Sequence, residues 1–178
     1  MNIKIYITII AIVLIAFLVL YKERTKQLGK AKVKRPPKVR IVYSKKQKTE
    51  ERPKITSSDG AVSVLREIWS SQIEVREEFV VLLLDRANRV LGYQLVSKGG
   101  MSGTIADVKL IYSVALESLA SGIIIAHNHP SGNTQPSQAD IQLTKKISEA
   151  GKQLDIILLD HIILTKESYY SLADEGLM

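Results

Sequence analysis

Apolar residues follow three different patterns along the chain, and each pattern predicts a different kind of structure. Residues 5–21 are uncharged and almost entirely apolar. Residues 22–54 contain few large apolar side chains and are rich in Lys, Arg and Pro. From residue 55 onward, short apolar runs alternate with stretches in which apolar residues recur every three or four positions, which is the spacing of one helix face. These patterns divide the chain into an N-terminal segment (1–21), a linker (22–54) and a folded domain (55–178).

The domain at 55–178 is predicted to have an α/β fold. Helices are expected to begin near residues 57, 107 and 137, where Ser or Asp can cap the first turn, and Gly122 and Gly151 are expected to follow the last two. Strands are expected at residues 79–85, 89–96, 123–127, 154–159 and 161–164. The inner face of the second helix is predicted to contain Val108, Ile111, Val114, Ala115, Leu116 and Leu119. Because strands and helices alternate, we expect a mixed β-sheet flanked by helices.

The N-terminal segment predicts one transmembrane helix that precedes this domain. Its seventeen apolar residues would cover roughly 25 Å as a helix, which is marginally enough for a hydrocarbon core. Tyr6 and Tyr21 lie near the two ends, where aromatic rings favour the membrane interface. A cleaved signal peptide is the alternative, but no small-residue cleavage pattern follows the apolar run. A buried core helix is also less suitable, because the segment has no polar face.

The charges are distributed very unevenly. The whole chain has 25 Lys and Arg against 18 Asp and Glu, for a net charge of +7, and residues 22–54 alone hold a net of +11. Such a linker is expected to be flexible and to lie against anionic lipid, although a nucleic-acid-binding tail is an alternative. By the positive-inside rule the domain faces the cytoplasm. We therefore expect a single-pass protein of the cell inner membrane.

The composition of the domain excludes several classes of function. Residues 55–178 carry a net charge of −5, which disfavours direct binding to nucleic acid because phosphate neutralisation supplies much of that affinity. The chain contains no cysteine, so a disulfide scaffold, a Cys-ligated metal and a thiol nucleophile are excluded.

Polar residues are densest between His127 and Asp140. The two histidines at positions 127 and 129 end an apolar run, and residues two apart in a strand point to the same face. Asp140 falls in the first turn of the next predicted helix. Two His and one carboxylate are the ligands of a catalytic zinc, with one position left open for water. The sequence therefore predicts a Zn²⁺ site formed by His127, His129 and Asp140.

Hydrolysis at such a site also requires a carboxylate that accepts the proton of the water. Glu77 and Glu78 lie immediately before the first strand, and spacing alone does not distinguish between them. Ser137 and Asp140 also match a helix capping box, and that interpretation is compatible with metal binding. His161 is isolated between two apolar stretches, so we interpret it as structural.

These motifs resemble the JAB/MPN (JAMM) metalloproteases. The family's metal signature, His-x-His, seven residues, Ser, two residues and Asp, matches His127, His129, Ser137 and Asp140 without a gap. The RadC-like branch is matched more specifically. Its likeness lies in His127-Asn-His129-Pro-Ser-Gly, Pro136-Ser137-Gln-Ala-Asp140, Glu77-Glu-Phe79, Leu82-Leu-Leu-Asp85, Asn88-Arg89, Gly99-Gly100 and Asp160-His-Ile-Ile163.

The resemblance implies a fold similar to the deaminases, with zinc held by the two histidines and the aspartate. It also implies that Glu77 is the general acid/base. Ser137 matches the serine that hydrogen-bonds near the metal water and helps to stabilise the oxyanion. We therefore expect a membrane-tethered, zinc-dependent metallopeptidase that hydrolyses peptide or isopeptide bonds in a peptide or protein substrate. The alternative is a non-catalytic or DNA-repair-associated binding module, although residues 1–54 contain no helix-hairpin-helix pattern.

Overall fold

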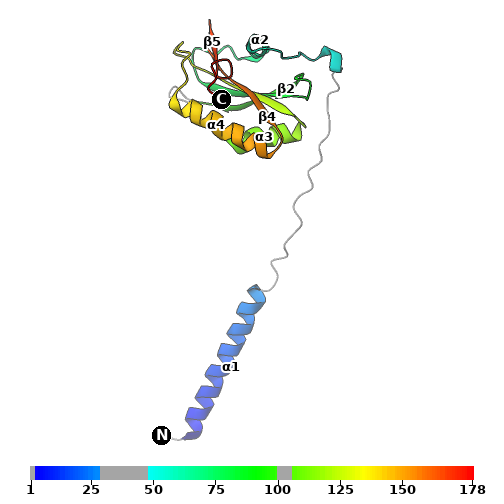
Figure 1. The fold of residues 1–178 in the computed structure, drawn as a ribbon. Coiled ribbons are helices and arrows are strands. Elements are labelled where there is room, and N and C mark those ends of the chain that lie inside the picture. Colours follow the sequence, from blue (N-terminus) through cyan, green and yellow to red (C-terminus); the bar gives the residue numbers. More distant parts are fainter. Residues whose placement is uncertain (1–2, 29–47, 100–105) are drawn as a thin grey trace. The chain divides into compact units, whose positions relative to one another are not determined.

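The computed structural model describes residues 3–28, 48–99 and 106–178. The chain divides into two compact units, residues 1–40 and 41–178. The first unit contains one long helix, α1 (Ile3–Leu28). The second contains the sheet and the remaining helices (Figure 1).

The prediction of a transmembrane helix at residues 1–21 is wrong. Among the described residues, no helix combines the length and the apolar character that crossing a membrane requires. The apolar part of α1 ends at Tyr21, and the helix continues through charged residues such as Lys22 and Arg24. That apolar part is therefore shorter than the roughly 20 residues of a typical span. The expected single-pass inner-membrane localisation is wrong for the same reason.

The predicted linker, residues 22–54, is described only at its two ends. Residues 22–28 are helical because α1 runs through Leu28. At the other end, a short 3-10 helix, η1 (Thr49–Glu51), precedes a single β-bridge between Lys54 and Arg89. Residues 29–47 lie outside the described part of the chain.

The second unit is built on a five-stranded sheet in the order β2-β1-β3-β4-β5. The strands are β1 (Glu78–Leu84), β2 (Val90–Lys98), β3 (Gly122–Asn128), β4 (Ile157–Leu164) and β5 (Tyr169–Ser171). Strands β3 and β4 are parallel, and the other neighbouring pairs are antiparallel. The predicted mixed sheet is therefore confirmed. Its central strands β1 and β3 are buried along their whole length, as continuous apolar runs require.

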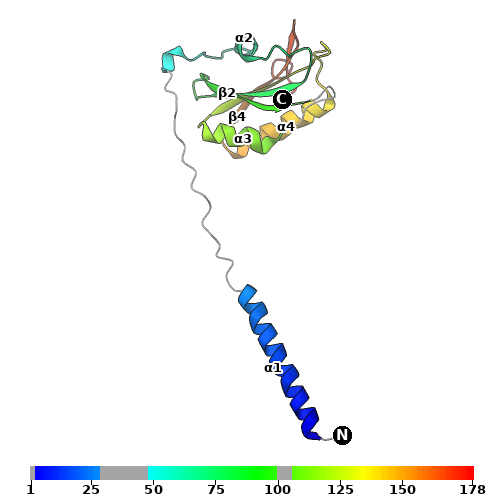
Figure 2. The same cartoon turned by 180° about the vertical axis from the view of Figure 1, so that it is seen from behind.

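Three helices pack on this sheet, and each begins after the capping residue that the sequence predicts. They are α2 (Ser58–Ile68), α3 (Val108–Glu117) and α4 (Gln138–Gln153), with Ser57, Asp107 and Ser137 as their N-caps. Both views show α3 and α4 together on one face of the sheet and α2 on the opposite face (Figures 1 and 2). The sheet therefore separates two hydrophobic layers.

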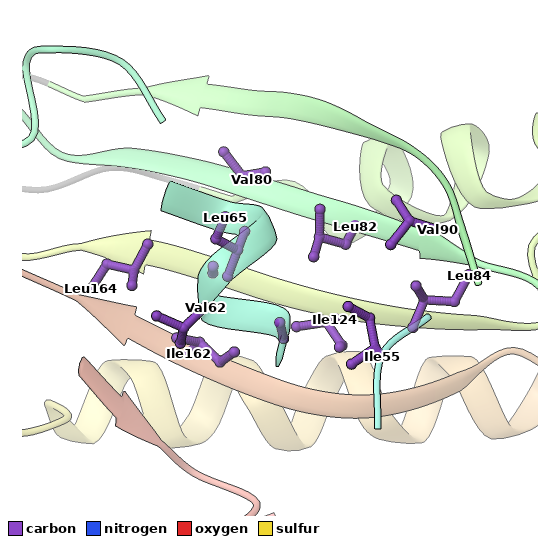
Figure 3. Packing of buried hydrophobic residues seen from close by; sticks show 12 residues of the cluster. Ile55, Val62, Leu65, Val80, Leu82, Leu84, Val90, Ile124, Ile162 and Leu164 are labelled. Atoms are coloured by element: carbon purple, nitrogen blue, oxygen red, sulfur yellow. The ribbon is translucent and has the colours of Figure 1, made fainter. Parts of the chain in front are cut away.

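The two layers are made by alternate residues of the same strands. On the α2 face, Leu82 and Ile124 pack with Leu65 in the cluster drawn in Figure 3. On the other face, Phe79 and Ile125 pack with residues of α3 and α4. Because successive side chains of a strand point to opposite faces, this alternation also decides which face each polar residue of β1 and β3 occupies.

Two predicted details of the helices differ from the structure. The inner face of α3 includes Tyr112, whereas Leu116 and Leu119 are exposed. The helix ends at Glu117, and Leu119 has a positive φ of 53°, so helical spacing no longer applies to it. Gly151 lies inside α4 rather than after it. A Cβ there would collide with the backbone carbonyl oxygen of Ile156 and would lie 2.5 Å from the Tyr112 hydroxyl oxygen, so close packing requires glycine at this position.

The two strands expected at 154–159 and 161–164 are one strand, β4. Its pairing with β3 shifts register between Ile123 and Ile124, where Leu158 and Asp160 are the successive partners. This irregularity is a β-bulge, which changes the face to which the following residues point. Beyond it, Ile162 and Leu164 lie in the α2 layer.

Candidate metal centre

The side chains of His127, His129 and Asp140 meet at the carboxyl end of β3. One ligand atom from each lies within 4.8 Å of the others. The Nε2 atoms of the two histidines are 3.0 Å apart. Asp140 places Oδ1 3.4 Å from His127 Nε2 and Oδ2 3.9 Å from His129 Nε2. The three residues predicted as metal ligands are thus close enough to share one ion.

One side of the cluster is buried in the domain, and the other side is partly exposed. The side chain of His127 is only 1% exposed, whereas those of His129 and Asp140 are 19% and 16% exposed. Phe79 pairs with His127 across β1 and β3, and its ring stacks against the imidazole with a centroid distance of 6.1 Å. Among the described residues, the accessible side of the cluster is therefore that of His129 and Asp140.

The carboxylate of Asp140 is oriented by the N-terminus of α4. The backbone N–H and the hydroxyl of Ser137 donate to Asp140 Oδ2 over 2.7 and 2.6 Å. The N–H of Asp140 donates back to Ser137 Oγ over 3.2 Å, which completes a capping box. The capping box and the convergence on the histidines therefore coexist. The expected contribution of Ser137 to an oxyanion site stays a prediction, because its hydroxyl here bonds to the carboxylate.

His129 presents Nε2 to the cluster because its other ring nitrogen is engaged. His129 Nδ1 is 2.7 Å from the carbonyl oxygen of Asn133. A carbonyl oxygen can only accept, so Nδ1 carries the proton and Nε2 of the neutral ring carries a lone pair. Metal-binding histidines usually donate their other ring N–H to a carbonyl or carboxylate oxygen in this way, which fixes the orientation of the ring.

Sequence reasoning missed the position of His161. It lies within β4, where it pairs with Ile125 of β3, and its Nε2 lies 2.8 Å from His127 Nδ1, on the side of that ring away from Asp140. Its own Nδ1 lies 2.6 Å from Thr144 Oγ1 on α4. His161 is 0% exposed. The sequence contained one indication of this contact, which is a histidine within an apolar run. A buried imidazole needs hydrogen-bond partners.

Burial keeps both inner histidines neutral at neutral pH. Desolvation lowers the pKa of His127 to about 4, with a smaller opposing effect from Asp140 and a further lowering by His129. Desolvation also lowers the pKa of His161 well below its usual value, and the neighbouring histidines add to this effect. His127 and Asp140 are therefore not a conventional ion pair. Neutral imidazole is the form that binds metal, so two ring nitrogens and one carboxylate make a donor set that fits a divalent cation.

The structure separates the two candidate bases. Glu78 is buried, accepts a 2.7 Å bond from the hydroxyl of Ser70, and lies 3.4 Å from Lys98 Nζ. Phe79, its neighbour, belongs to the layer that contains His127. Because adjacent residues alternate between faces, Glu78 points away from His127. By the same alternation, position 77 belongs to the face of Phe79. Glu77 itself is partly exposed just before β1.

Asn128, between the two histidines, is a second residue whose role was not predicted. It is 0% exposed. Its amide donates to the carbonyl oxygens of Ile73 and Arg76 over 2.6 and 2.9 Å, and its Oδ1 accepts from Glu78 N–H over 2.8 Å. These three bonds attach the turn before β1 to β3. Asn128 therefore attaches the segment that carries Glu77 to the end of β3.

Comparison with known proteins identifies relatives for the domain. A family model described as "RadC-like JAB domain" matches residues 55–177. A "UPF0758 protein" of Flavobacterium johnsoniae is 49% identical over 124 residues, which are 70% of this chain and 53% of the relative. Proteins with the same name from Porphyromonas gingivalis and Methanosarcina mazei are 47% and 42% identical over 58% and 57% of this chain, and 46% and 44% of theirs. The chain thus spans about half the length of the curated relatives it matches.

Proposed function

The chain belongs to the RadC-like JAB domain family, as its motifs predicted, and on this premise we propose that it is a zinc-dependent hydrolase of peptide or isopeptide bonds. The JAB domain family is generally metallohydrolase-like, and the structure contains a His-His-Asp group that could hold a metal ion. The observation that carries the proposal is the convergence of His127, His129 and Asp140 within 4.8 Å, with one side accessible.

In this proposal His127 Nε2, His129 Nε2 and one oxygen of Asp140 hold the zinc. Three protein ligands leave a fourth position for water or substrate, as in catalytic rather than structural zinc sites. When bound, zinc supplies a Lewis acid that polarises the substrate carbonyl and lowers the pKa of a water molecule to about 7. The partial exposure of His129 and Asp140 supports an open position on their side.

Glu77 is proposed as the general base and acid. It would accept a proton from the attacking water and then donate it to the departing amine, which must leave in its neutral form. Strand alternation supports this choice, because Glu78 is engaged with Ser70 and Lys98 in the other layer. Ser137 is proposed to hold the carboxylate of Asp140 in place and to contribute a donor near the oxyanion.

Metal content and hydrolysis of the full chain test the proposal together. The parent is expected to bind about one zinc per chain, and His129→Ala is expected to lose it. Glu77→Gln should keep the zinc but lose at least about 100-fold in hydrolysis of peptide and isopeptide libraries, because it removes the base and no ligand. Glu78→Gln is the matched control and should retain most of the activity. Thermal unfolding of each variant verifies that it is folded.

Each part of the proposal has its own contrary result. Equal zinc in the parent and in His129→Ala would show that the ligands are wrongly assigned. Equal hydrolysis by the parent and Glu77→Gln would show that Glu77 is not the general base. A larger loss in Glu78→Gln than in Glu77→Gln would assign that role to Glu78. Zinc binding without hydrolysis of any library would favour the non-catalytic binding module instead.

A further inference from the structure

All three histidines of the chain lie in one cluster, but they do not have the same role in it. Nε2 of His161 contacts Nδ1 of His127, which is the ring nitrogen of His127 on the side away from Asp140. Thr144 then contacts His161, and its hydroxyl also contacts the backbone of α4. A continuous row of short hydrogen bonds therefore runs from α4 through β4 to the histidine at the end of β3.

The direction of these hydrogen bonds is set at the α4 end. Thr144 Oγ1 lies 2.6 Å from the backbone carbonyl oxygen of Asp140 and 2.6 Å from His161 Nδ1. The carbonyl oxygen has no proton, so the single hydroxyl proton of Thr144 is donated to it. Thr144 Oγ1 must then accept from His161 Nδ1, which therefore carries the proton of that ring.

The same reasoning continues to His127. With its proton on Nδ1, the neutral ring of His161 has a lone pair on Nε2. This atom is 2.8 Å from His127 Nδ1, so His127 donates from Nδ1 and keeps a lone pair on Nε2. That lone pair points toward His129 Nε2 and Asp140 Oδ1.

We propose that Thr144 and His161 are positioning residues that hold His127 in its Nδ1-protonated tautomer, so that its Nε2 lone pair is always available to a metal ion. The reverse tautomer of His127 would place a proton where the ion binds. It would also leave Nδ1 and the Nε2 lone pair of His161 as two acceptors 2.8 Å apart. The proposed tautomer instead turns the Nε2 lone pairs of His127 and His129 toward each other over 3.0 Å, and a cation bound between them relieves that repulsion.

Burial makes this arrangement specific. Thr144 and His161 are 0% exposed and His127 is 1% exposed, so water has no access to replace a missing donor or acceptor. The ring of Phe79 lies against both histidines, with centroid distances of 6.1 and 6.0 Å. In such surroundings each polar atom depends on its protein partner. A change at Thr144, two hydrogen bonds away, should therefore alter which ring nitrogen of His127 carries the proton.

The inference rests on the proposed metal site for its purpose, but the tautomer itself can be measured without metal. The probe is long-range ¹H–¹⁵N NMR of the metal-free full chain labelled at its three histidines. In the parent, His127 and His161 are both expected to show the Nδ1-protonated pattern. The Nε2-protonated pattern for His127 would overturn the proposal. A parent that binds no zinc would refute the proposed function, whereas its NMR spectrum would still decide the tautomer.

A pair of substitutions at Thr144 then tests the chain of bonds. Thr144→Val keeps the size and removes the hydroxyl, so His161 loses its acceptor and the Nε2-protonated form of His127 should appear. Zinc affinity, measured by competition with a chelator, and the Co²⁺ absorption spectrum report the result. The loss of affinity is expected to be 10- to 100-fold, the usual effect of removing an outer-shell partner. Thr144→Ser keeps the hydroxyl and should stay within about threefold of the parent.

A second pair at His161 keeps the test decisive if the valine variant unfolds. His161→Gln retains an acceptor for the His127 proton and should preserve the tautomer of His127 and most of the zinc affinity. His161→Leu retains neither and should lose both. Equal affinities within either pair, for folded variants, would show that packing alone positions His127 and would overturn the proposal.

Discussion

Replacing Asn128 with Ala should detach the turn that carries Glu77 from β3. Two of the three hydrogen bonds of this side chain reach the carbonyl oxygens of Ile73 and Arg76, and the third accepts the N–H of Glu78. The two carbonyls belong to partly exposed residues, so water can replace part of what they lose. The Glu78 N–H is in a buried residue and would remain unpaired.

These differences set the expected magnitude. Each of the two carbonyl bonds should account for about 1 kcal/mol, and the unpaired N–H for roughly 2 kcal/mol. The free energy of unfolding should therefore fall by about 4 kcal/mol. Asn133→Ala is the matched control, because Asn133 is exposed and its side chain accepts one bond, from the N–H of Gln135. That variant should lose less than about 1 kcal/mol.

Urea unfolding of the full chain measures the first effect, and hydrogen exchange by mass spectrometry measures where it occurs. In Asn128→Ala, exchange should accelerate in the peptide that contains residues 71–78 even under conditions in which the domain stays folded. Hydrolysis should fall with it, because Glu77 lies in that peptide. A loss below about 1 kcal/mol, with unchanged exchange in 71–78, would refute the positioning role of Asn128.

Two further substitutions test neighbouring features of the domain. Ser137→Ala should lower the free energy of unfolding by about 1 kcal/mol through loss of the helix cap and weaken zinc binding about tenfold. Ser137→Thr should retain the stability and the zinc affinity of the parent. Zinc affinity of the alanine variant equal to that of the parent would exclude orientation of Asp140 by this hydroxyl. Burial raises the pKa of Tyr112 from 10.0 to about 12, so between these pH values the unfolded phenol ionises before the folded one and the parent loses stability as pH rises. Tyr112→Phe has no phenol to ionise, but it also loses the 2.6 Å hydrogen bond to the Ile147 carbonyl. It should therefore be about 1 kcal/mol less stable than the parent at pH 7, and its stability should approach that of the parent above pH 10. A pH-independent difference in urea unfolding would contradict this.

Local features of the chain predicted most of its secondary structure. Ser57, Asp107 and Ser137 cap the three helices of the domain, because capping involves residues only two or three positions apart. The β1–β2 hairpin follows in the same way from two apolar runs and a short turn between Asp85 and Asn88. The prediction for α1 was wrong although the segment is helical, because the apolar run is shorter than a membrane span needs.

Packing decided what local pattern did not. Helical periodicity predicted an inner face for α3, but Tyr112 is buried there because it contacts Gly151 and the Ile147 carbonyl of α4. The glycine at 151 was predicted to follow the helix, yet it lies inside α4, where a Cβ would collide with the backbone carbonyl oxygen of Ile156 and with the Tyr112 hydroxyl of α3. The contacts of Tyr112 with α4 join residues at least 35 positions apart, which no local window contains, whereas the contact of Gly151 with the Ile156 carbonyl oxygen is local.

The candidate site also combines features that local spacing predicts with contacts that depend on the fold. Local spacing along the chain predicted that His127 and His129 share one strand face and that Asp140 lies at a helix start, since strand alternation and capping are local geometry. The contact of His161 with His127 could not be read from local spacing, because it depends on the parallel register of β4 with β3. The tertiary structure also decided that Glu78 faces the opposite layer from His127, because it reveals Ser70 and Lys98 as its partners. Short-range periodicity is contained in the chain, whereas contacts between distant strands depend on register and bulges that form only when the sheet assembles.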